Sequence, residues 1–188
     1  MDFELTDDQL ELQRTVRDVL DREAPASLAR DIAEGSGSAD ELWATLTSLD
    51  WPALCLPESV GGLGRGWVEL AVLLEEMSHV NAALSACLGI HADITAPYIV
   101  AMGTEEQKQR WLPGAASGEI LLAIGMTEPS GGSDLAALKT SAVKDGDDWV
   151  INGSKTFITN GYSADLVITA VRTDPEKGAR GISLFAIP

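Results

Sequence analysis

The fold is decided at the stretch Glu119-Ile120-Leu121-Leu122-Ala123-Ile124-Gly125-Met126, where the hydrophobic period of the sequence changes. This stretch is an apolar run of strand length, whereas the residues before it place apolar side chains at helical spacing. Several short strand-like segments, separated by turn residues, come after it. Strands that follow helices without alternating with them are typical of an α+β fold. We therefore predict an all-α helical domain at residues 1–117 and a partial β domain at residues 118–188.

Capping boxes mark three helix starts in the first part of the chain. They are Thr6-Asp7-Asp8-Gln9, Ser38-Ala39-Asp40-Glu41 and Thr104-Glu105-Glu106-Gln107. In each one a hydroxyl can accept the backbone N–H three residues later, whose own side chain can reach back. The third helix is expected to end before Pro113, because proline has no N–H to donate within a helix.

Two longer apolar stretches, residues 67–77 and 82–100, indicate helices that are buried on more than one side. Pro97 marks a possible break or kink in the second stretch. We find no apolar run near the roughly 20 residues that a membrane-spanning helix needs. The first part of the chain is therefore predicted to be a helical domain that contacts no membrane.

The strand-like segments of the second part are separated by Gly-containing turns. They are Ser141–Val143, Trp149–Ile151, Lys155–Thr159, Leu166–Val171 and Ile182–Ile187. The turn Asp145-Gly146-Asp147 predicts a hairpin between the first two. We expect an antiparallel sheet that is incomplete at Pro188, because a strand that ends there leaves an edge to be covered.

Charge and cysteine content exclude several classes of function. The net charge is −16, with 5 basic and 18 acidic residues at 1–100 but 8 and 11 at 101–188. Nucleic acids and anionic membranes are poor partners for such a chain, since both need clustered lysine and arginine. A polyanionic small molecule is expected to bind the nearly balanced second part. Cys55 and Cys87 have apolar neighbours, which predicts reduced thiols in an intracellular, cytoplasmic protein, with a single bridge as the alternative.

The loop Met126-Thr127-Glu128-Pro129-Ser130-Gly131-Gly132-Ser133-Asp134 follows a predicted strand and combines small residues with hydroxyls. Its glycines allow close approach of the backbone to a ligand, and successive N–H groups can cradle an anion. By itself the loop is more typical of an ordinary turn, and it matches neither a P-loop nor a dinucleotide fingerprint. Glu128 is the acid in this loop that invites a catalytic role, but we interpret it as a structural residue.

Motifs spread along the chain give the loop its context. They are Leu56-Pro57-Glu58 with Gly61-Gly62-Leu63-Gly64, Gly103-Thr104-Glu105-Glu106-Gln107-Lys108 with Trp111-Leu112-Pro113, the segment 149–161, and Gly181-Ile182-Ser183-Leu184-Phe185. The segment 149–161 reads Trp149-Val150-Ile151-Asn152-Gly153-Ser154-Lys155-Thr156-Phe157-Ile158-Thr159-Asn160-Gly161. In order and spacing, these motifs resemble the acyl-CoA dehydrogenase family over almost the whole chain.

The resemblance implies a helical domain, a central β domain and a C-terminal four-helix bundle, of which the bundle is absent from these 188 residues. It implies FAD as cofactor and the oxidation of an acyl-CoA thioester to the trans-2-enoyl-CoA, as in fatty acid β-oxidation. An electron-transfer flavoprotein is the implied electron acceptor, and a homo-oligomer, usually a tetramer, is the implied assembly.

The resemblance also places eight residues at the cofactor. The backbone at Ile124 and Met126 is expected to face the isoalloxazine ring, with the Thr127 hydroxyl at its pyrimidine side. Gly132 and Ser133 are expected to approach the pyrophosphate, and Ser133 also the CoA substrate. Phe157 and Ile158 are expected against the flavin, with the Thr159 hydroxyl toward N5. Donors at these positions stabilise negative charge on a reduced flavin, and an aromatic ring excludes water.

Ordinary structural roles compete with each of these assignments when the residues are judged alone. Phe157 would be a core residue in a strand, and Thr127 and Thr159 would be strand or turn threonines. His79 and His91 lie in apolar helical surroundings, where core or surface histidines are more common than metal ligands. No nucleophile elbow accompanies the two histidines, which argues against a hydrolase.

The glutamate that removes the α-proton in the family lies on the C-terminal bundle, so we expect it beyond Pro188. The 188-residue chain alone is then expected to be inactive and to be a fragment, a cut chain or a short subunit. Two other functions remain open. One is an acyl-CoA oxidase or flavin monooxygenase on the same scaffold, and the other is a non-catalytic subunit that completes the flavin site of a partner.

Overall fold

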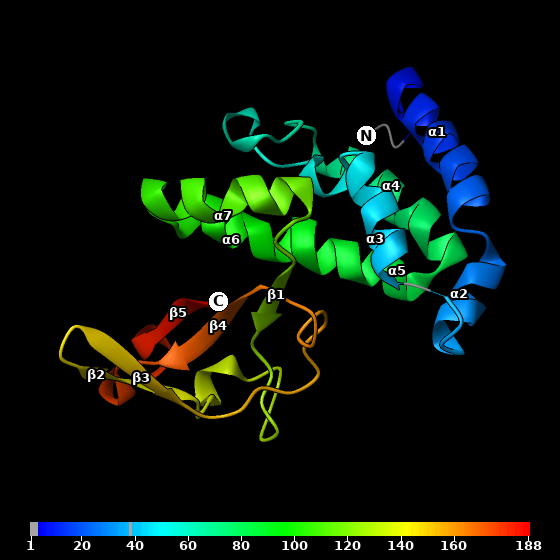
Figure 1. Ribbon diagram of the computed structural model, residues 1–188. Helices are drawn as coiled ribbons and strands as arrows, with labels where there is room; N and C mark the ends of the chain where they lie inside the picture. Colours follow the sequence, from blue (N-terminus) through cyan, green and yellow to red (C-terminus); the bar gives the residue numbers. More distant parts are fainter. Residues whose placement is uncertain (1–3, 38) are drawn as a thin grey trace. The chain divides into compact units, whose positions relative to one another are not determined.

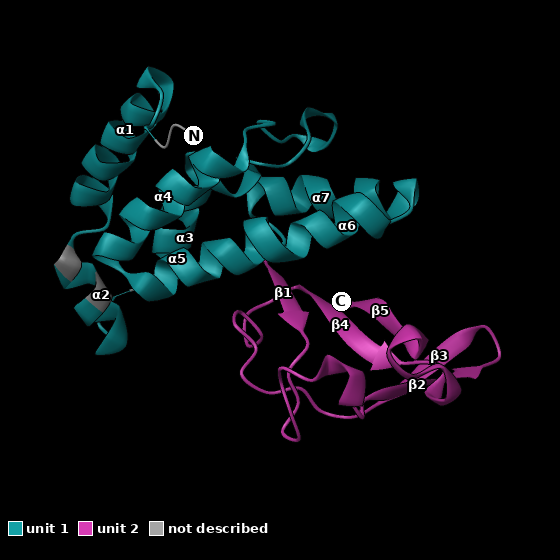
Figure 2. Cartoon of the chain, turned by 180° about the vertical axis from the view of Figure 1, so that it is seen from behind, with its two compact units in different colours: residues 1–120 teal, residues 121–188 magenta. Residues whose placement is uncertain are grey.

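The computed structural model describes residues 4–37 and 39–188. The chain divides into two units, residues 1–120 and residues 121–188, which are coloured separately in Figure 2. The sequence places this change three residues earlier, between residues 117 and 118. The first unit is helical and the second contains a β-sheet (Figure 1), which confirms the predicted α+β class.

The helical unit contains seven α-helices, two short 3-10 helices and one π-helical segment among the described residues. They are α1 (Asp7–Glu23), α2 (Ala26–Ala33), α3 (Ala39–Ser48), η1 (Trp51–Ala53), η2 (Glu58–Val60), α4 (Trp67–Val80), α5 (Ala82–Leu88), η3 (Gly89–Thr95), α6 (Ala96–Met102) and α7 (Glu105–Ser117).

The predicted capping boxes of α1 and α7 are present. At α1 the Gln9 N–H donates to Thr6 Oγ1 over 3.3 Å, and the Thr6 N–H donates to Gln9 Oε1 over 3.0 Å. Thr104 and Gln107 repeat this pair of bonds at α7. The third predicted box begins at Ser38, which lies outside the described residues. Capping boxes are satisfied within one turn, so short-range sequence predicts them well.

An ion pair joins α1 to α4, with the Glu76 side chain 3% exposed and the Arg17 side chain 57% exposed. Arg17 Nη2 lies 2.7 Å from Glu76 Oε1, and Arg17 Nε donates to Glu76 Oε2 over 2.8 Å. Val16 and Leu20 of α1 pack into the same core as Leu73 of α4. The two-pronged bond satisfies a carboxylate that would otherwise be buried unpaired, so it fixes how α1 lies on α4.

Segments α5, η3 and α6 form one helical stretch, Ala82–Met102, of 21 residues. By length and composition this stretch could cross a membrane, which corrects the expectation that no apolar stretch comes near that length. Leu88 and Ala92 of this stretch are buried in the hydrophobic core of the unit, and 39% of its most apolar window is buried. Pro97 does not break it. A π-helical turn precedes Pro97 instead, and this turn changes the hydrogen-bond pattern where the proline N–H is missing.

Helix α7 continues past Pro113 to Ser117, so the predicted end before Pro113 is wrong. Two side chains from other helices hold its last turn. Trp43 Nε1 donates to the Gly118 carbonyl over 3.0 Å, and His91 Nε2 lies 2.9 Å from the Ala115 carbonyl. These long-range bonds pair the carbonyls of Ala115 and Gly118 at the end of the helix. The helix stops at Gly118, whose φ of 77° is left-handed.

The β unit contains one five-stranded sheet with two 3-10 turns. The elements are β1 (Leu122–Gly125), η4 (Leu135–Ala137), β2 (Ser141–Asp145), β3 (Asp148–Asn152), β4 (Leu166–Arg172), η5 (Pro175–Gly181) and β5 (Ile182–Ile187). The strand order is β1-β4-β2-β3, and β5 also pairs with β4.

The sheet is mixed, which corrects the prediction of an antiparallel sheet. Strands β2 and β3 form the predicted hairpin, and β4 pairs antiparallel with β5. However, β1 runs parallel to β4, with Leu122 opposite Leu166 and Gly125 opposite Thr169. Parallel pairing needs a long crossover between the strands, and residues 126–165 supply it. Such pairing over a long distance leaves no local signal in the sequence.

The segment Lys155–Thr159, predicted as a strand, is irregular. Phe157 has φ 55° and Asn160 has φ 64°, both in the left-handed region. Non-glycine residues rarely adopt this conformation, and it is incompatible with an extended strand. The segment therefore turns sharply twice within four residues.

Candidate functional site

Two segments that are distant in sequence, residues 122–128 and 155–160, are bonded to each other in the β unit. The Thr156 N–H donates to the Thr127 carbonyl over 3.0 Å, and Asn160 Nδ2 donates to the Leu122 carbonyl over 3.1 Å. These segments carry six of the eight predicted site residues: Ile124, Met126, Thr127, Phe157, Ile158 and Thr159. The structure therefore brings the two predicted motifs together.

The other two predicted residues follow a tight turn. The Glu128 N–H donates to the Gly131 carbonyl over 2.9 Å, and the Gly131 N–H donates back over 3.0 Å. Next in the chain, the N–H groups of Gly132 and Ser133 donate to no atom among the described residues. A Cβ on Gly132 would lie 3.5 Å from Thr127 Cγ2, so this loop lies beside the first segment. Free consecutive N–H groups of this kind can bind an anion.

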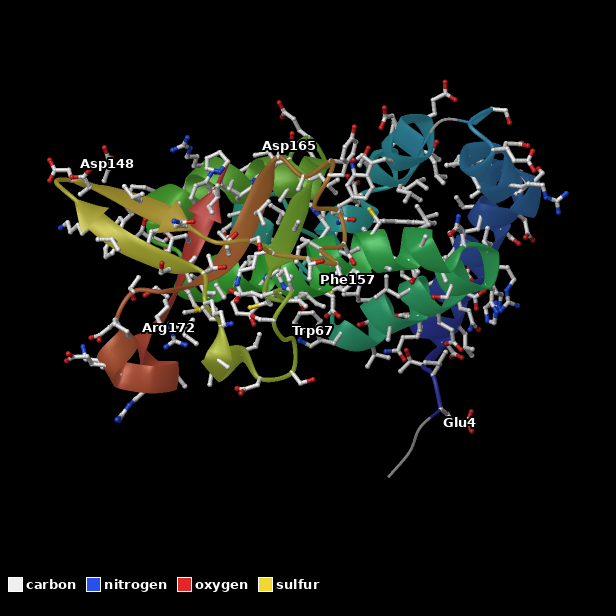
Figure 3. All side chains as sticks on the ribbon, turned by 90° about the horizontal axis from the view of Figure 1, so that it is seen from below. Glu4, Trp67, Asp148, Phe157, Asp165 and Arg172 are labelled. Carbon is white, nitrogen blue, oxygen red and sulfur yellow. The ribbon has the colours of Figure 1, made fainter. Side chains whose placement is uncertain are left out.

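Arg172, at the end of β4, holds the chain just after this loop (labelled in Figure 3). Its Nη2 donates to the Ala136 carbonyl over 2.6 Å, and its Nε donates to the Leu138 carbonyl over 3.2 Å. Its Nη1 reaches the Gly178 carbonyl over 3.0 Å. Through these hydrogen bonds the guanidinium joins the end of β4 to the backbone of η4 and its C-terminal cap and to the backbone of η5. Sequence reasoning did not single out Arg172, because its partners are all backbone carbonyls.

Phe157 presents an aromatic ring to solvent from a left-handed backbone position. Its side chain, labelled in Figure 3, belongs to a residue that is 93% exposed. This corrects the expectation of a core phenylalanine that the residue pattern alone suggests. Strained residues cluster at ligand sites, where the surrounding structure holds them in place. An exposed ring held in this way is suited to contact a planar ligand.

The remaining predicted residues differ in accessibility. Thr159 is exposed, whereas Thr127, Met126 and Ile124 are half-buried. Ile158 is also half-buried, and it lines a cavity of about 490 Å³ together with Lys155 and Thr169. None of the other predicted residues lines this cavity. The residues that could hold a ligand thus range from half-buried to exposed.

Glu128 is buried, and three donors surround its carboxylate. The Lys139 and Thr140 N–H groups donate to its two oxygens over 2.6 and 2.9 Å, and Lys155 Nζ donates over 2.9 Å. Burial by itself would raise the pKa of Glu128, but these donors outweigh it and lower the pKa to about 2. The carboxylate therefore stays ionised near neutral pH and is unsuited to exchange protons. This geometry supports the structural interpretation of Glu128.

The histidines give no sign of a metal site. His91 is buried, with its ring bonded to the Ala115 carbonyl and 5.5 Å from the Trp43 ring, whereas His79 is exposed. No cluster of three or more His, Cys, Asp or Glu side chains suited to a metal ion occurs among residues 4–37 and 39–188.

Comparison with known proteins shows the family of the chain. Residues 6–119 match the family model described as acyl-CoA dehydrogenase, N-terminal domain, and residues 123–188 match the model of the middle domain. An acyl-CoA dehydrogenase from Bacillus subtilis is 36% identical over 185 residues, which are 97% of this chain and 48% of that protein.

Solved structures show the same likeness. An acyl-CoA dehydrogenase from Geobacillus kaustophilus is 40% identical with a TM-score of 0.92, over 100% of this chain and 49% of that one. A glutaryl-CoA dehydrogenase from Mycobacterium smegmatis, solved in complex with FADH2, is 30% identical with a TM-score of 0.87. That match covers 98% of this chain and 46% of the other. The chain thus spans about half the length of the relatives it matches.

Proposed function

Because the chain belongs to the acyl-CoA dehydrogenase family, we propose that it forms the flavin- and substrate-facing half of an FAD-dependent acyl-CoA dehydrogenase. The reaction is the α,β-dehydrogenation of an acyl-CoA thioester to the trans-2-enoyl-CoA. The observation that carries the proposal is the bonding of residues 122–128 to residues 155–160, which brings together the two segments that carry six of the eight predicted flavin residues. We propose that these segments, with the adjacent Gly132 and Ser133, present one flavin-binding surface.

The residues of this surface fit the cofactor in three respects. The unbonded N–H groups of Gly132 and Ser133 can donate to a pyrophosphate. No atom lies within 4 Å of a Cβ placed on Gly131, so nothing there obstructs the approach of a ligand to the backbone. The exposed Phe157 ring can cover one face of the isoalloxazine.

Each chain residue then has a defined task. The backbone at Ile124 and Met126 lies along the ring, and the Thr127 hydroxyl bonds its pyrimidine side. Ser133 binds both the pyrophosphate and the CoA moiety. Phe157 and Ile158 exclude water from the ring, and Thr159 donates its hydroxyl near N5. FAD, when bound, supplies the capacity to accept the hydride.

The general base is proposed to come from outside this chain. Glu128 is unsuited, because its carboxylate is buried, bonded to three donors and ionised down to a pKa of about 2. A carboxylate with so low a pKa is a poor proton acceptor at neutral pH. We assign proton removal to a glutamate in the half of the protein that this chain does not span. An electron-transfer flavoprotein as acceptor, a homo-oligomeric assembly and a cytoplasmic location complete the proposal.

The test uses a chimera, called the completed protein below, that joins residues 1–188 to the C-terminal half of the Geobacillus kaustophilus relative. Anaerobic addition of acyl-CoA thioesters of graded length is expected to bleach the visible absorption band of the bound flavin. Reduction followed by rapid reoxidation in air would indicate an oxidase or a flavin monooxygenase instead. If no acyl-CoA bleaches a flavin that is bound, the dehydrogenase assignment is wrong.

The 188-residue chain alone should bind FAD weakly and should not oxidise acyl-CoA, because the base and part of the cofactor cage are missing. Fluorescence titration with FAD and a dye-linked dehydrogenase assay measure the two properties. Turnover by the isolated chain would disprove the assignment of the base to the other half.

Thr159→Ala in the completed protein is expected to slow flavin reduction by acyl-CoA about tenfold, with a smaller effect on substrate binding. A hydrogen bond to a developing charge contributes on the order of 1.5 kcal/mol, which is about tenfold in rate. Stopped-flow absorbance over a range of substrate concentrations separates the reduction rate from binding. Ser163→Ala, at an exposed serine of the same turn, is the control. An unchanged reduction rate in Thr159→Ala would remove this hydroxyl from the flavin site.

A further inference from the structure

Lys155 is a buried cation at the junction of the two site segments. Its ammonium lies 2.9 Å from Glu128 Oε1 and 3.1 Å from the Met126 carbonyl. The side chains of Lys155 and Glu128 are only 11% and 4% exposed. Burying an ammonium group is costly unless it is paired and hydrogen-bonded, and here both conditions hold.

The position of Lys155 matters because strand pairing ends just before the site. The β1–β4 ladder stops at Gly125, which is opposite Thr169. The next two carbonyls, of Met126 and Thr127, accept from Lys155 Nζ and from the Thr156 N–H, respectively. These two neighbouring donors therefore satisfy the backbone carbonyls beyond the end of the β1–β4 ladder, in the segment that carries the Thr127 hydroxyl.

The two acceptors that Lys155 bonds differ in whether they have other donors. The Glu128 carboxylate is also held by the Lys139 and Thr140 N–H groups, so it keeps two donors if Lys155 is removed. The Met126 carbonyl accepts no other hydrogen bond from the described residues. Loss of the ammonium should therefore act mainly on residues 126–127.

We propose that Lys155 is a positioning residue for the flavin. Through the Met126 carbonyl and the Glu128 carboxylate, its ammonium fixes the segment 126–128 and so aims the Thr127 hydroxyl at the pyrimidine side of the isoalloxazine ring. This inference rests on the proposed function, because it needs FAD on this surface. It goes beyond that function by assigning a role to a residue that does not touch the cofactor.

A purely structural role for the ion pair makes a different prediction. In that case replacement of Lys155 lowers stability but leaves the environment of any flavin that still binds unchanged. A positioning role changes the hydrogen bonding at the ring, so the spectrum of the saturated flavin shifts. Affinity for FAD and the flavin spectrum therefore discriminate between the two roles, and neither depends on catalytic activity.

The experiment compares Lys155→Met and Lys155→Arg with the unmodified completed protein. Lys155→Met removes the positive charge and all hydrogen-bond donors but keeps an unbranched side chain. Lys155→Arg keeps the positive charge and hydrogen-bond donors. Lys177→Met is the matched control, since Lys177 forms a 2.8 Å pair with Asp174 in the same unit but is 66% exposed. FAD dissociation constants, visible spectra at saturation and urea unfolding of the FAD-free protein are measured for each. Lys155→Gln takes the place of Lys155→Met if the latter does not fold.

We expect Lys155→Met to weaken FAD binding at least about tenfold, as expected for loss of a charged hydrogen bond, and to shift the visible band at saturation. Lys155→Arg is expected to keep most of the FAD affinity and most of the band position. Lys177→Met is expected to change neither the affinity nor the band. Affinity within about twofold of the unmodified protein, with an unshifted band, overturns the inference even if stability falls. If the unmodified completed protein binds no FAD, the proposed function itself is wrong. This outcome differs from failure of the Lys155 inference, because it is seen without any substitution.

Discussion

Replacing Glu128 by glutamine is expected to lower the free energy of unfolding of the β unit by about 3 kcal/mol, the range for breaking a buried ion pair. The carboxylate accepts from Lys139, Thr140 and Lys155, so both of its oxygens are used. Glutamine has one oxygen, and its NH₂ group would face a donor. The variant therefore leaves the Lys155 ammonium uncompensated and at least one buried N–H unsatisfied.

The contribution of Glu128 also has a defined pH dependence. Its folded-state pKa, about 2, lies below the ordinary value of 4.5. The unfolded chain therefore takes up the proton first as the pH falls. The stabilisation is fully present above about pH 4.5 and is lost as the pH falls toward 2. Glu128→Gln should remove this part of the acid sensitivity.

Urea unfolding and amide hydrogen exchange of the 188-residue chain provide the measurement. Exchange at the Lys139 and Thr140 amides should quicken most, because these groups lose their acceptor. Glu176→Gln, at an exposed glutamate of the same unit, should change stability by less than about 0.5 kcal/mol. A loss of similar size in both variants would contradict the role assigned to the Glu128 carboxylate.

Lowering the pH from about 6.5 to about 4 is expected to cost the helical unit up to about 3 kcal/mol through His91 alone. Burial lowers the pKa of His91 to about 4, and the bond to the Ala115 carbonyl opposes this only in part. Between these pH values the unfolded chain binds a proton that the folded chain does not. Stability at this site is therefore present above pH 6.5 and is lost as the pH falls.

His91→Gln should abolish this pH dependence, because glutamine does not titrate and can still donate to the Ala115 carbonyl. Urea unfolding at pH 7 and pH 4.5, followed by tryptophan fluorescence, compares the variant with the unmodified chain. His79→Gln is the control, since His79 is exposed on α4 and should leave the pH dependence in place. An equal pH dependence in His91→Gln and the unmodified chain would show that other groups are responsible.

Local features of the fold could be predicted from the sequence. The capping boxes at Thr6 and Thr104 and the hairpin turn at Gly146 involve residues only a few positions apart. Their geometry depends on short-range hydrogen bonds and on the freedom of glycine, so the residues themselves specify it. The family resemblance likewise predicts which residues form the candidate site.

The arrangement of that site was decided at long range. The sequence pattern predicts Lys155 in a strand, yet its ammonium bonds to Glu128, 27 residues earlier in the chain. The left-handed Phe157 is held in a segment whose bonds go to Leu122 and Thr127, which are also distant in sequence. Local propensity predicts an extended strand there, and tertiary hydrogen bonds override it.

By itself, the sequence determined that helices precede strands, where most of them start, and which family the chain resembles. Only the tertiary structure decided that Trp43 and His91 bond to the end of α7, that β1 runs parallel to β4, and that Lys155 bonds to the Met126 carbonyl. The physical reason is the range of the interactions. Caps and turns are satisfied within a few residues, whereas these three features depend on partners that chain folding brings together from far apart.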